Sequence, residues 1–324
     1  MPAKKKKELE SEKYTFSSDT LYRKVCGIHD SRIKDLESFL KITIIPRGLS
    51  LILNGGIEEV THAMKFFANL EENFKSRPDK DNFDNFDINY LIRSKDSPAD
   101  NKTTWNPTEK VLTTYKGKAL YPRTANQQKF VESLMKNMVS FALGPAGTGK
   151  TFLSIAVACR LLQNGEIDRL ILTRPAVEAG ESLGFLPGDL VQKVDPYLRP
   201  IYDSLHECIG PEKVQVLTSL GKIEIAPIAF MRGRTLANSF IILDEAQNCT
   251  SMQLKMILTR LGKNSRMAIS GDVTQIDLAN NRSGLQKVMS ALKSVEGIGV
   301  IELKKEDITR HPLIEVILER LDKI

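Results

Sequence analysis

The stretch FALGPAGTGKTFL, Phe141 to Leu153, decides the fold of the larger part of this chain. A short apolar run leads into a glycine-rich turn, and the residues after the turn favour a helix. Positions 144–151 fit the pattern G-x-x-x-x-G-K-[ST]. Glycines let backbone N–H groups approach an anion closely, and a helix N-terminus carries partial positive charge. The stretch is therefore predicted to be a strand, a phosphate-binding loop and a helix.

Each residue of this loop is expected to contact a nucleotide. The predicted nucleotide-binding residues are Gly144, Pro145, Ala146, Gly147, Thr148, Gly149, Lys150 and Thr151. The ammonium of Lys150 should reach the β- and γ-phosphates and serve catalysis, while the hydroxyl of Thr151 should bind Mg²⁺.

A second motif, FIILDEAQN, begins at Phe240. Four apolar residues predict a buried strand, and ligand sites of α/β proteins lie at the carboxyl ends of such strands. Asp244 follows the strand and is expected to bind both the nucleotide and Mg²⁺. Its neighbour Glu245 is the predicted base that takes a proton from the attacking water.

Two further stretches are expected to complete the nucleotide site. RMAISGDVTQID, beginning at Arg266, predicts a buried strand followed by Gln275, whose amide could sense the γ-phosphate and orient water. RTANQQKFVESL, beginning at Arg123, offers Gln127 or Gln128. A side-chain amide can pair with N6 and N7 of adenine, so Gln127 is predicted to favour ATP over GTP.

Apolar runs alternate with helical segments from Arg123 to the end of the chain. The runs are SFALG, RLILTRP, IEIAPI, FIILDEA, RMAISGD and IGVIEL. Alternation of this kind predicts a parallel sheet covered by helices on both faces. We expect an α/β domain over residues 119–324.

The segment before this domain has a different pattern. Residues 20–75 predict the order β-α-β-β-α, with a first strand over Thr20–Ile28 and a first helix over Asp30–Leu40. This order is that of a small α+β RNA-binding module of the KH type, although no GxxG lies between the two predicted helices. An interaction or oligomerisation domain is the other interpretation. Residues 1–19 are expected to be a basic flexible tail, and residues 76–118 a linker with a hairpin.

Composition sets limits on these interpretations. The formal net charge of +6 is compatible with phosphate-bearing partners without requiring them. No apolar run reaches the roughly 18 residues that a membrane span needs, and no secretory leader is visible. The four cysteines form no CxxC pair, which favours thiols in a reducing compartment. We expect a cytoplasmic protein without a membrane partner.

The motifs taken together resemble the PhoH family. The resemblance rests on LTRPAVEAGESLGFLPGDLVQKVDPYLRPIYDSL from Leu172, on APIAFMRGRTLANSFIILDEAQN and SGDVTQIDL, and on ITRHPLIEVIL near the end of the chain. It covers roughly residues 119–324, and the first 75 residues are similar to the degenerate KH-like domain of shorter members. The nuclease domain of some longer members is not apparent.

The resemblance implies an ATP-hydrolysing core of the RecA and superfamily 1 helicase type, preceded by the KH-like domain. It also implies a homo-oligomeric ring, for which a hexamer is suspected, and a role in RNA metabolism. A YbeY-type endoribonuclease of ribosomal RNA maturation is a candidate partner. Because one core lacks an outside charge at the γ-phosphate, Arg310 is predicted to be an arginine finger given to a neighbouring subunit.

Three arginines are candidates for contact with RNA phosphates. Arg174 follows the second predicted strand of the domain, and Arg232 and Arg234 precede the strand of the acid pair. They could instead contact ATP or brace loops between subunits. Three functions stay open at this point: an RNA-coupled ATPase with helicase-like activity, an ATP-driven switch that docks RNA-processing proteins, and a small-molecule kinase. The acid pair argues against the kinase, which needs no activated water.

Overall fold

The computed structural model describes residues 9–76, 88, 109–175, 190–276, 283–309 and 320. It divides the chain into two compact units, Met1–Thr108 and Glu109–Ile324. We call them the N-terminal unit and the C-terminal unit and describe each by itself.

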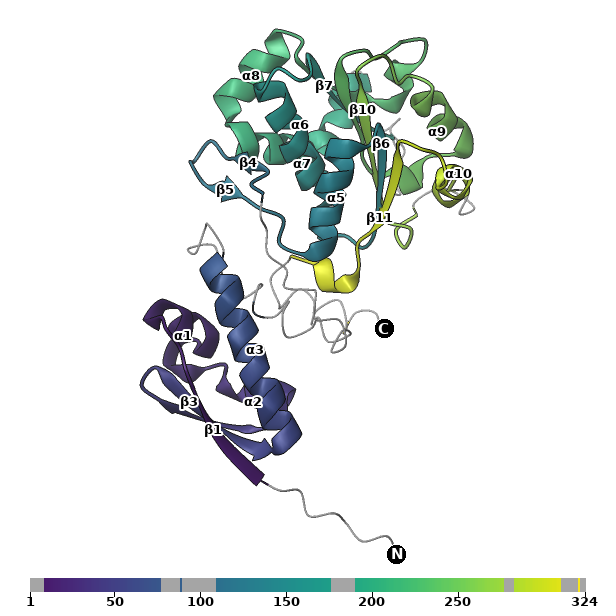
Figure 1. Cartoon of the computed structure of the whole chain (residues 1–324). Helices are drawn as coiled ribbons and strands as arrows, with labels where there is room; N and C mark the ends of the chain where they lie inside the picture. The colour runs from purple at the N-terminus through teal and green to yellow at the C-terminus, as the bar shows by residue number, and fades with distance from the viewer. Residues whose placement is uncertain are drawn as a thin grey trace, which may run out of the picture. The chain divides into compact units, whose positions relative to one another are not determined.

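The N-terminal unit is a three-stranded antiparallel sheet packed against helices (Figure 1). Its elements are β1 (Leu9–Thr15), α1 (Asp19–Cys26), a 3₁₀ turn (Ile28–Asp30), α2 (Ile33–Leu40), β2 (Thr43–Arg47), β3 (Ser50–Gly56) and α3 (Ile57–Ser76). The strands lie in the order β1-β3-β2, and the core joins Leu36 of α2, Leu53 of β3 and Phe67 of α3. The segment between α1 and α2 begins Gly27-Ile28-His29-Asp30, so it also lacks a GxxG.

The prediction of a first strand over Thr20–Ile28 is wrong, because most of that segment forms helix α1. Leu21 and Val25 are buried one helical turn apart, and the Ser18 hydroxyl caps the helix by accepting a hydrogen bond from the Leu21 amide. The strand of the sheet is β1, which lies within the stretch expected to be a flexible tail. Most β1 side chains are exposed, so main-chain pairing with β3 holds this strand and the apolar pattern does not reveal it.

The C-terminal unit contains a six-stranded parallel sheet in the order β11-β6-β10-β9-β7-β8 (Figure 1). The strands are β6 (Val139–Leu143), β7 (Arg169–Arg174), β8 (Ile223–Pro227), β9 (Ser239–Leu243), β10 (Arg266–Gly271) and β11 (Ile298–Glu302). Each corresponds to one of the six apolar runs of the sequence. The structure therefore confirms the predicted α/β class.

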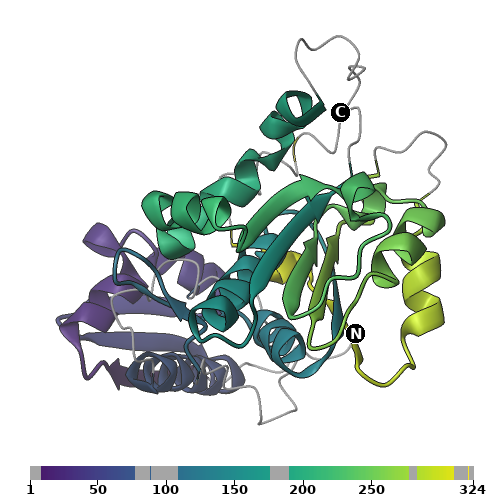
Figure 2. The same ribbon diagram turned by 90° about the horizontal axis from the view of Figure 1, so that it is seen from above.

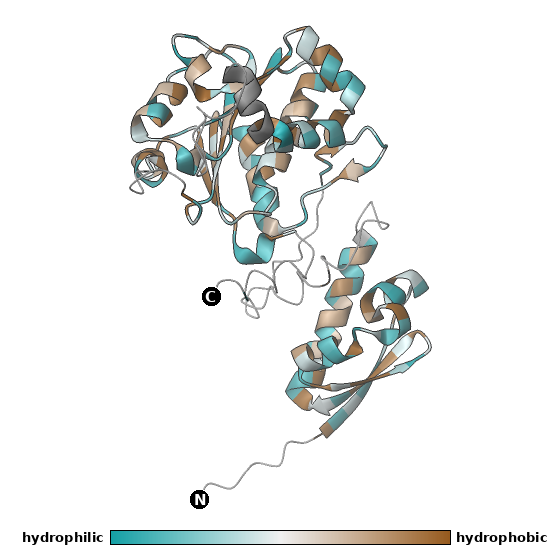
Figure 3. Ribbon diagram, turned by 180° about the vertical axis from the view of Figure 1, so that it is seen from behind, coloured by the Kyte–Doolittle hydropathy of each residue, from teal (hydrophilic) through white to brown (hydrophobic). Residues whose placement is uncertain are grey.

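Helices cover both faces of this sheet (Figure 2). One face packs against α5 (Ala125–Lys136), α6 (Lys150–Gln163), α7 (Leu190–Ile209) and α8 (Pro211–Ser219), and the other against α9 (Ser251–Leu258) and α10 (Leu285–Leu292). Phe240 faces the first layer and its neighbour Ile241 the second, as alternation along a strand requires. The strands of this sheet are mostly apolar (Figure 3). Helix α6 is apolar too, with every residue from Leu153 to Cys159 buried.

Short elements complete the C-terminal unit. A hairpin is formed by β4 (Leu112–Thr113) and β5 (Ala119–Leu120), and 3₁₀ turns lie at η4 (Ile228–Met231), η5 (Ala246–Asn248) and η7 (Lys305–Asp307). None of the helices in the described part of the chain is long and apolar enough to cross a membrane. All four cysteines are buried and free of disulfides.

The strand register places four carboxyl ends at one edge of the sheet. Leu143 of β6 pairs with Gly271 of β10, and Leu243 of β9 pairs with Ile269 of β10 and Thr173 of β7. The residues that follow these strands therefore meet at one edge, which is where an α/β sheet binds its ligand.

Candidate active site

The loop after β6 has the backbone of a phosphate-binding loop. Gly147 and Gly149 both have φ of 82°, and α6 begins at Lys150 directly after them. At Gly144, with φ of 148°, an added Cβ would lie 2.3 Å from the carbonyl oxygen of Leu303, so only glycine fits. The Lys150 ammonium donates to the Gly144 and Pro145 carbonyl oxygens at 2.7 and 2.8 Å. The loop thus combines backbone donors, a helix N-terminus and a cation.

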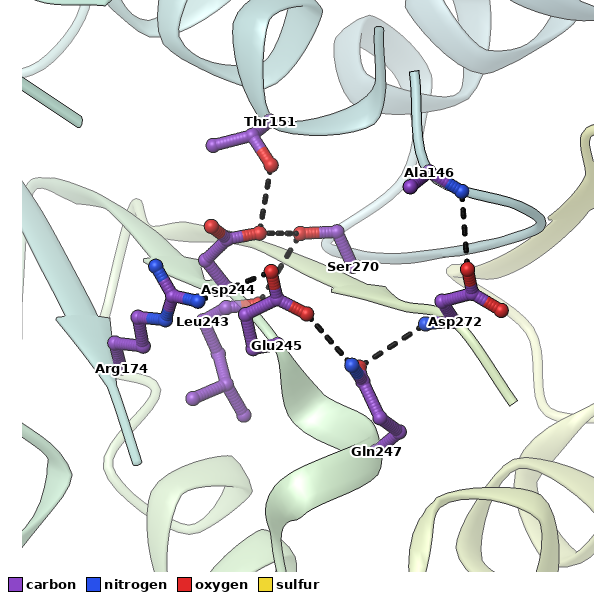
Figure 4. A network of polar contacts seen from close by, with 9 residues as sticks. All are labelled: Ala146, Thr151, Arg174, Leu243, Asp244, Glu245, Gln247, Ser270 and Asp272. Atoms are coloured by element: carbon purple, nitrogen blue, oxygen red, sulfur yellow. Dashed lines mark hydrogen bonds and ion pairs between the residues drawn. The ribbon is translucent and has the colours of Figure 1, made fainter. Parts of the chain in front are cut away.

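A buried carboxylate lies beside the first turn of α6 (Figure 4). The Thr151 hydroxyl donates to Asp244 Oδ1 at 2.6 Å, and the Ser270 hydroxyl donates to the same oxygen at 2.8 Å. Asp244 is only 6% exposed. The structure therefore brings together the two residues predicted to bind a metal, and adds Ser270 from the neighbouring strand.

The donor set at this point suits Mg²⁺. A hydroxyl and a carboxylate are hard oxygen ligands, and Mg²⁺ in nucleotide sites usually takes one or two protein carboxylates together with substrate phosphates and water. No group of three or more His, Cys, Asp or Glu side chains gathers in the described residues, so nothing there offers a cage built by the protein alone.

The second acid of the pair has an unusual backbone and two partners. Glu245 has φ of 53° and ψ of 41°, a left-handed conformation that is uncommon for this residue type. Its Oε1 accepts from Arg174 at 3.1 Å and its Oε2 accepts from the Gln247 amide at 2.6 Å. The carboxylate is thereby oriented at the sheet edge between the ends of β7 and β9 (Figure 4).

Asp272, at the end of β10, connects the acid pair to the phosphate loop. Its Oδ2 accepts from the Ala146 amide at 2.9 Å, and its own backbone amide donates to Gln247 Oε1 at 3.0 Å. The Asp272 Oδ1 accepts from the amide and hydroxyl of Thr274. Gln275, the predicted sensor, has an exposed side chain. Its backbone N–H donates to the Asp272 carbonyl oxygen.

Gln127 lies under the phosphate loop. Its Nε2 donates to the Thr148 carbonyl at 3.0 Å and its Oε1 accepts from the Arg123 amide at 2.7 Å. Gln127 is 3% exposed. The Thr124 hydroxyl caps α5 by accepting a hydrogen bond from the backbone N–H of Gln127. The side chain therefore joins the start of α5 to the loop, and recognition of adenine stays a prediction.

The segment after β11 also touches the phosphate loop. The amide and hydroxyl of Thr309 donate to the Gly147 carbonyl at 2.9 and 3.1 Å. Arg310, the predicted finger, lies outside the described residues.

The other two candidate RNA contacts are Arg234 and Arg232. Arg234 forms a two-point ion pair with Glu224 of β8, and its hydrogen bonds lower the pKa of that carboxyl. Arg232, two residues earlier, is exposed. This ion pair lies within one chain, so RNA contact and bracing between subunits both stay predictions for Arg234.

Sequence reasoning singled out neither Gln247, Ser270 nor Thr309. All three lie within the motifs named above: Gln247 two residues after the acid pair, Ser270 two residues before Asp272, and Thr309 directly before Arg310. For Gln247 and Ser270, the position next to a predicted strand end is the signal that could have found them.

A phosphate loop after β6, with an acid pair two strands away in a parallel sheet, defines a P-loop NTPase. Comparison with known proteins agrees. A profile of the PhoH family, described as PhoH-like protein, matches residues 119–322. The chain belongs to the PhoH family.

Relatives of known sequence match at high identity. The PhoH-like protein of Bacillus subtilis is 44% identical over 298 residues, which cover 92% of each chain. That of Synechocystis is 56% identical over 211 residues, 65% of this chain and 64% of the relative. Protein PhoH of Escherichia coli is 43% identical over 60% of this chain and 55% of its own length.

Among solved structures, the large terminase of a thermophilic bacteriophage covers 61% of this chain and 50% of its own, at 10% identity and a TM-score of 0.41. The Pif1 helicase of Candida albicans covers 61% and 43%, at 15% identity and a TM-score of 0.33. The fold class rests on the sheet order and the phosphate loop of the chain itself.

Proposed function

We propose that this chain is a Mg²⁺-dependent ATPase whose hydrolysis is coupled to RNA. The proposal rests on the position of the Glu245 carboxylate, which two hydrogen bonds hold in place. The residue before it, Asp244, accepts a hydrogen bond from the Thr151 hydroxyl. A carboxylate at this place beside a phosphate loop can accept the proton of a water that attacks the γ-phosphate.

The chain's residues divide the work of hydrolysis. The loop amides and Lys150 hold the phosphates, Thr151 and Asp244 hold Mg²⁺, and Gln275 senses the γ-phosphate. The bound metal would neutralise charge on the phosphate oxygens. Glu245 takes one proton from the attacking water. The oxygen of this water forms a bond to the γ-phosphorus. The bond between that phosphorus and the bridging oxygen breaks, and ADP leaves. Gln127, joined to the loop through Thr148, would favour adenine.

Coupling to RNA is supported by Arg174, which contacts Glu245, and by exposed Arg232. Arg174 lies at the end of β7 with 22% of its side chain exposed, and Arg232 is exposed on the loop before β9. Guanidinium groups in such positions can bind backbone phosphates. The chain would act in the cytoplasm on RNA, for which a YbeY-type endoribonuclease is a candidate partner. Helicase activity and a role in ribosomal RNA maturation are further parts of the proposal.

A ring of subunits would complete the site. We expect Arg310 of a neighbouring subunit to supply charge at the γ-phosphate, an effect worth about 10³–10⁵ in rate. If Arg310→Ala left both assembly and hydrolysis unchanged, this part of the proposal would be wrong.

The affinity for RNA in two nucleotide states tests the coupling. Fluorescence anisotropy of a labelled single-stranded RNA would be measured with a non-hydrolysable ATP analogue and with ADP, both with Mg²⁺. Coupling between sites is reciprocal, so the two dissociation constants should differ at least about 5-fold. Equal constants would instead favour the ATP-driven switch, which acts by docking proteins.

A further inference from the structure

A chain of hydrogen bonds links the predicted RNA contact to the predicted base and to the phosphate loop (Figure 4). It runs from the Arg174 guanidinium to Glu245, from Glu245 to the Gln247 amide, and from Gln247 to the Asp272 backbone amide. The Asp272 carboxylate then accepts from the Ala146 amide in the loop.

Both oxygens of Glu245 are engaged by the protein in this arrangement. Arg174 donates to Oε1 and Gln247 donates to Oε2. Each oxygen keeps a second lone pair, but a water that is to give its proton to the carboxylate can approach from fewer directions while both donors are in place. The base is therefore held in place and partly blocked by the same contacts.

The two contacts to Glu245 differ in burial and in the number of atoms that they join. The amide of Gln247 is fixed at its other end, because its Oε1 accepts from the Asp272 amide at 3.0 Å, and the residue is 1% exposed. Arg174 contacts Glu245 through one nitrogen at 3.1 Å, and the side chains are 22% and 32% exposed. The pair of Arg234 with Glu224, by contrast, uses two nitrogens and two oxygens. Partly exposed single-point ion pairs are weak, so the Arg174 contact is the one that can open.

A phosphate group is a better partner for this guanidinium than a single carboxylate oxygen. Arginine binds phosphate through two parallel N–H···O contacts, which a planar fork makes without rearrangement. A phosphodiester backbone passing the end of β7 would thus take Arg174 from Glu245, while Gln247 keeps the carboxylate in orientation.

We propose that Arg174 is a positioning residue that restrains Glu245, and that the phosphodiester backbone of single-stranded nucleic acid releases the restraint. This inference rests on the proposed coupling to RNA and names the residue that carries it. Nucleic acid raises the hydrolysis rate because the attacking water can then also approach Oε1 of Glu245 from the side that Arg174 occupied.

The test compares Arg174→Ala with the wild type in steady-state ATP hydrolysis, without nucleic acid and with single-stranded RNA or DNA of the same sequence. The weak pair predicts that Arg174→Ala hydrolyses ATP about 3- to 5-fold faster than the wild type without nucleic acid. Stimulation by either strand should fall below about 2-fold. Comparison of DNA with RNA shows whether the protein recognises the phosphodiester backbone, which both contain, or the ribose of RNA.

Two further variants keep the test interpretable. Arg160→Ala breaks another ion pair of the same unit, with Glu109 at 2.8 Å, and should change neither rate. Arg174→Lys retains the charge without the planar fork, so its rate without nucleic acid should lie between those of wild type and Arg174→Ala. If Arg174→Ala does not fold, the rates of Arg174→Lys with and without nucleic acid test the restraint in its place.

The outcomes separate this inference from the proposed function. A slower Arg174→Ala that keeps its full stimulation would overturn the restraint while leaving RNA coupling intact. A faster Arg174→Ala beside a wild type that neither strand stimulates would support the restraint and overturn nucleic acid as its release, and with it the proposed coupling.

Discussion

Replacing Glu245 with Gln should separate nucleotide binding from hydrolysis. The change is nearly isosteric, and the new Oε1 can still accept from Arg174. The new amide nitrogen, however, faces the Gln247 Nε2, which now donates to Oε2 at 2.6 Å. A flip of the Gln247 side-chain amide would remove this clash between two donors. The flip would also break the hydrogen bond that Gln247 Oε1 accepts from the Asp272 backbone N–H.

The cost of Glu245→Gln to local stability can be compared with its cost to the rate of hydrolysis. One lost hydrogen bond to a charged group costs about 1.5–3 kcal/mol of local stability, and the neighbouring contacts remain. Loss of a general base lowers the rate by about 10²–10⁴, or about 2.7–5.5 kcal/mol in the activation free energy. The dominant effect should therefore be on hydrolysis.

The assay is single-turnover hydrolysis of ATP together with binding of a fluorescent ATP analogue. We expect hydrolysis to fall at least about 100-fold and the dissociation constant to change less than about 3-fold, because none of the contacts of Glu245 described above involves the phosphate loop. Glu302→Gln, which changes an exposed carboxylate at the end of β11, is the matched control and should leave both unchanged. A Glu245→Gln rate within about 3-fold of the wild type would refute its role as the base.

Three other perturbations follow from the contacts. Asp244→Asn can still accept from Thr151 and Ser270, so we expect a folded protein in which Mg²⁺ strengthens nucleotide binding about 10-fold less than in the wild type, measured by titration with and without Mg²⁺. Gly144→Ala would bring a Cβ against the Leu303 carbonyl and should weaken nucleotide binding at least about 10-fold; unchanged affinity would contradict the loop geometry. In the N-terminal unit, burial alone would raise the pKa of Glu71, but hydrogen bonds from Ser17, Tyr14 and Lys75 outweigh it and lower the pKa from 4.5 to about 2. The stabilisation is complete above pH 4.5 and is lost as the pH falls towards 2, so the higher urea midpoint of the wild type over Glu71→Gln at about pH 7 should shrink at about pH 3.

The phosphate loop and the acid pair could be predicted from the sequence because their chemistry is local. A glycine spacing before a helix and two acids after an apolar run specify both conformation and charge. The six strands were predictable for a similar reason, since buried parallel strands are continuous apolar runs.

Contacts between distant segments could not be predicted. Arg174 and Glu245 are 71 residues apart, and only the pairing of β7 with β9 brings them together. The position of Thr309 against Gly147 depends in the same way on β11 lying next to β6. Strand β1 escaped prediction because its side chains are mostly solvated and its stability comes from main-chain hydrogen bonds to β3.

The central claim, that this site couples ATP hydrolysis to RNA, is tested most directly by the steady-state hydrolysis rate with and without single-stranded RNA at low and high salt. Glu245→Gln serves as the blank. The account predicts stimulation that fades as salt rises, since backbone contacts release counterions. A hydrolysis rate above the blank that RNA leaves unchanged at every salt concentration would contradict it.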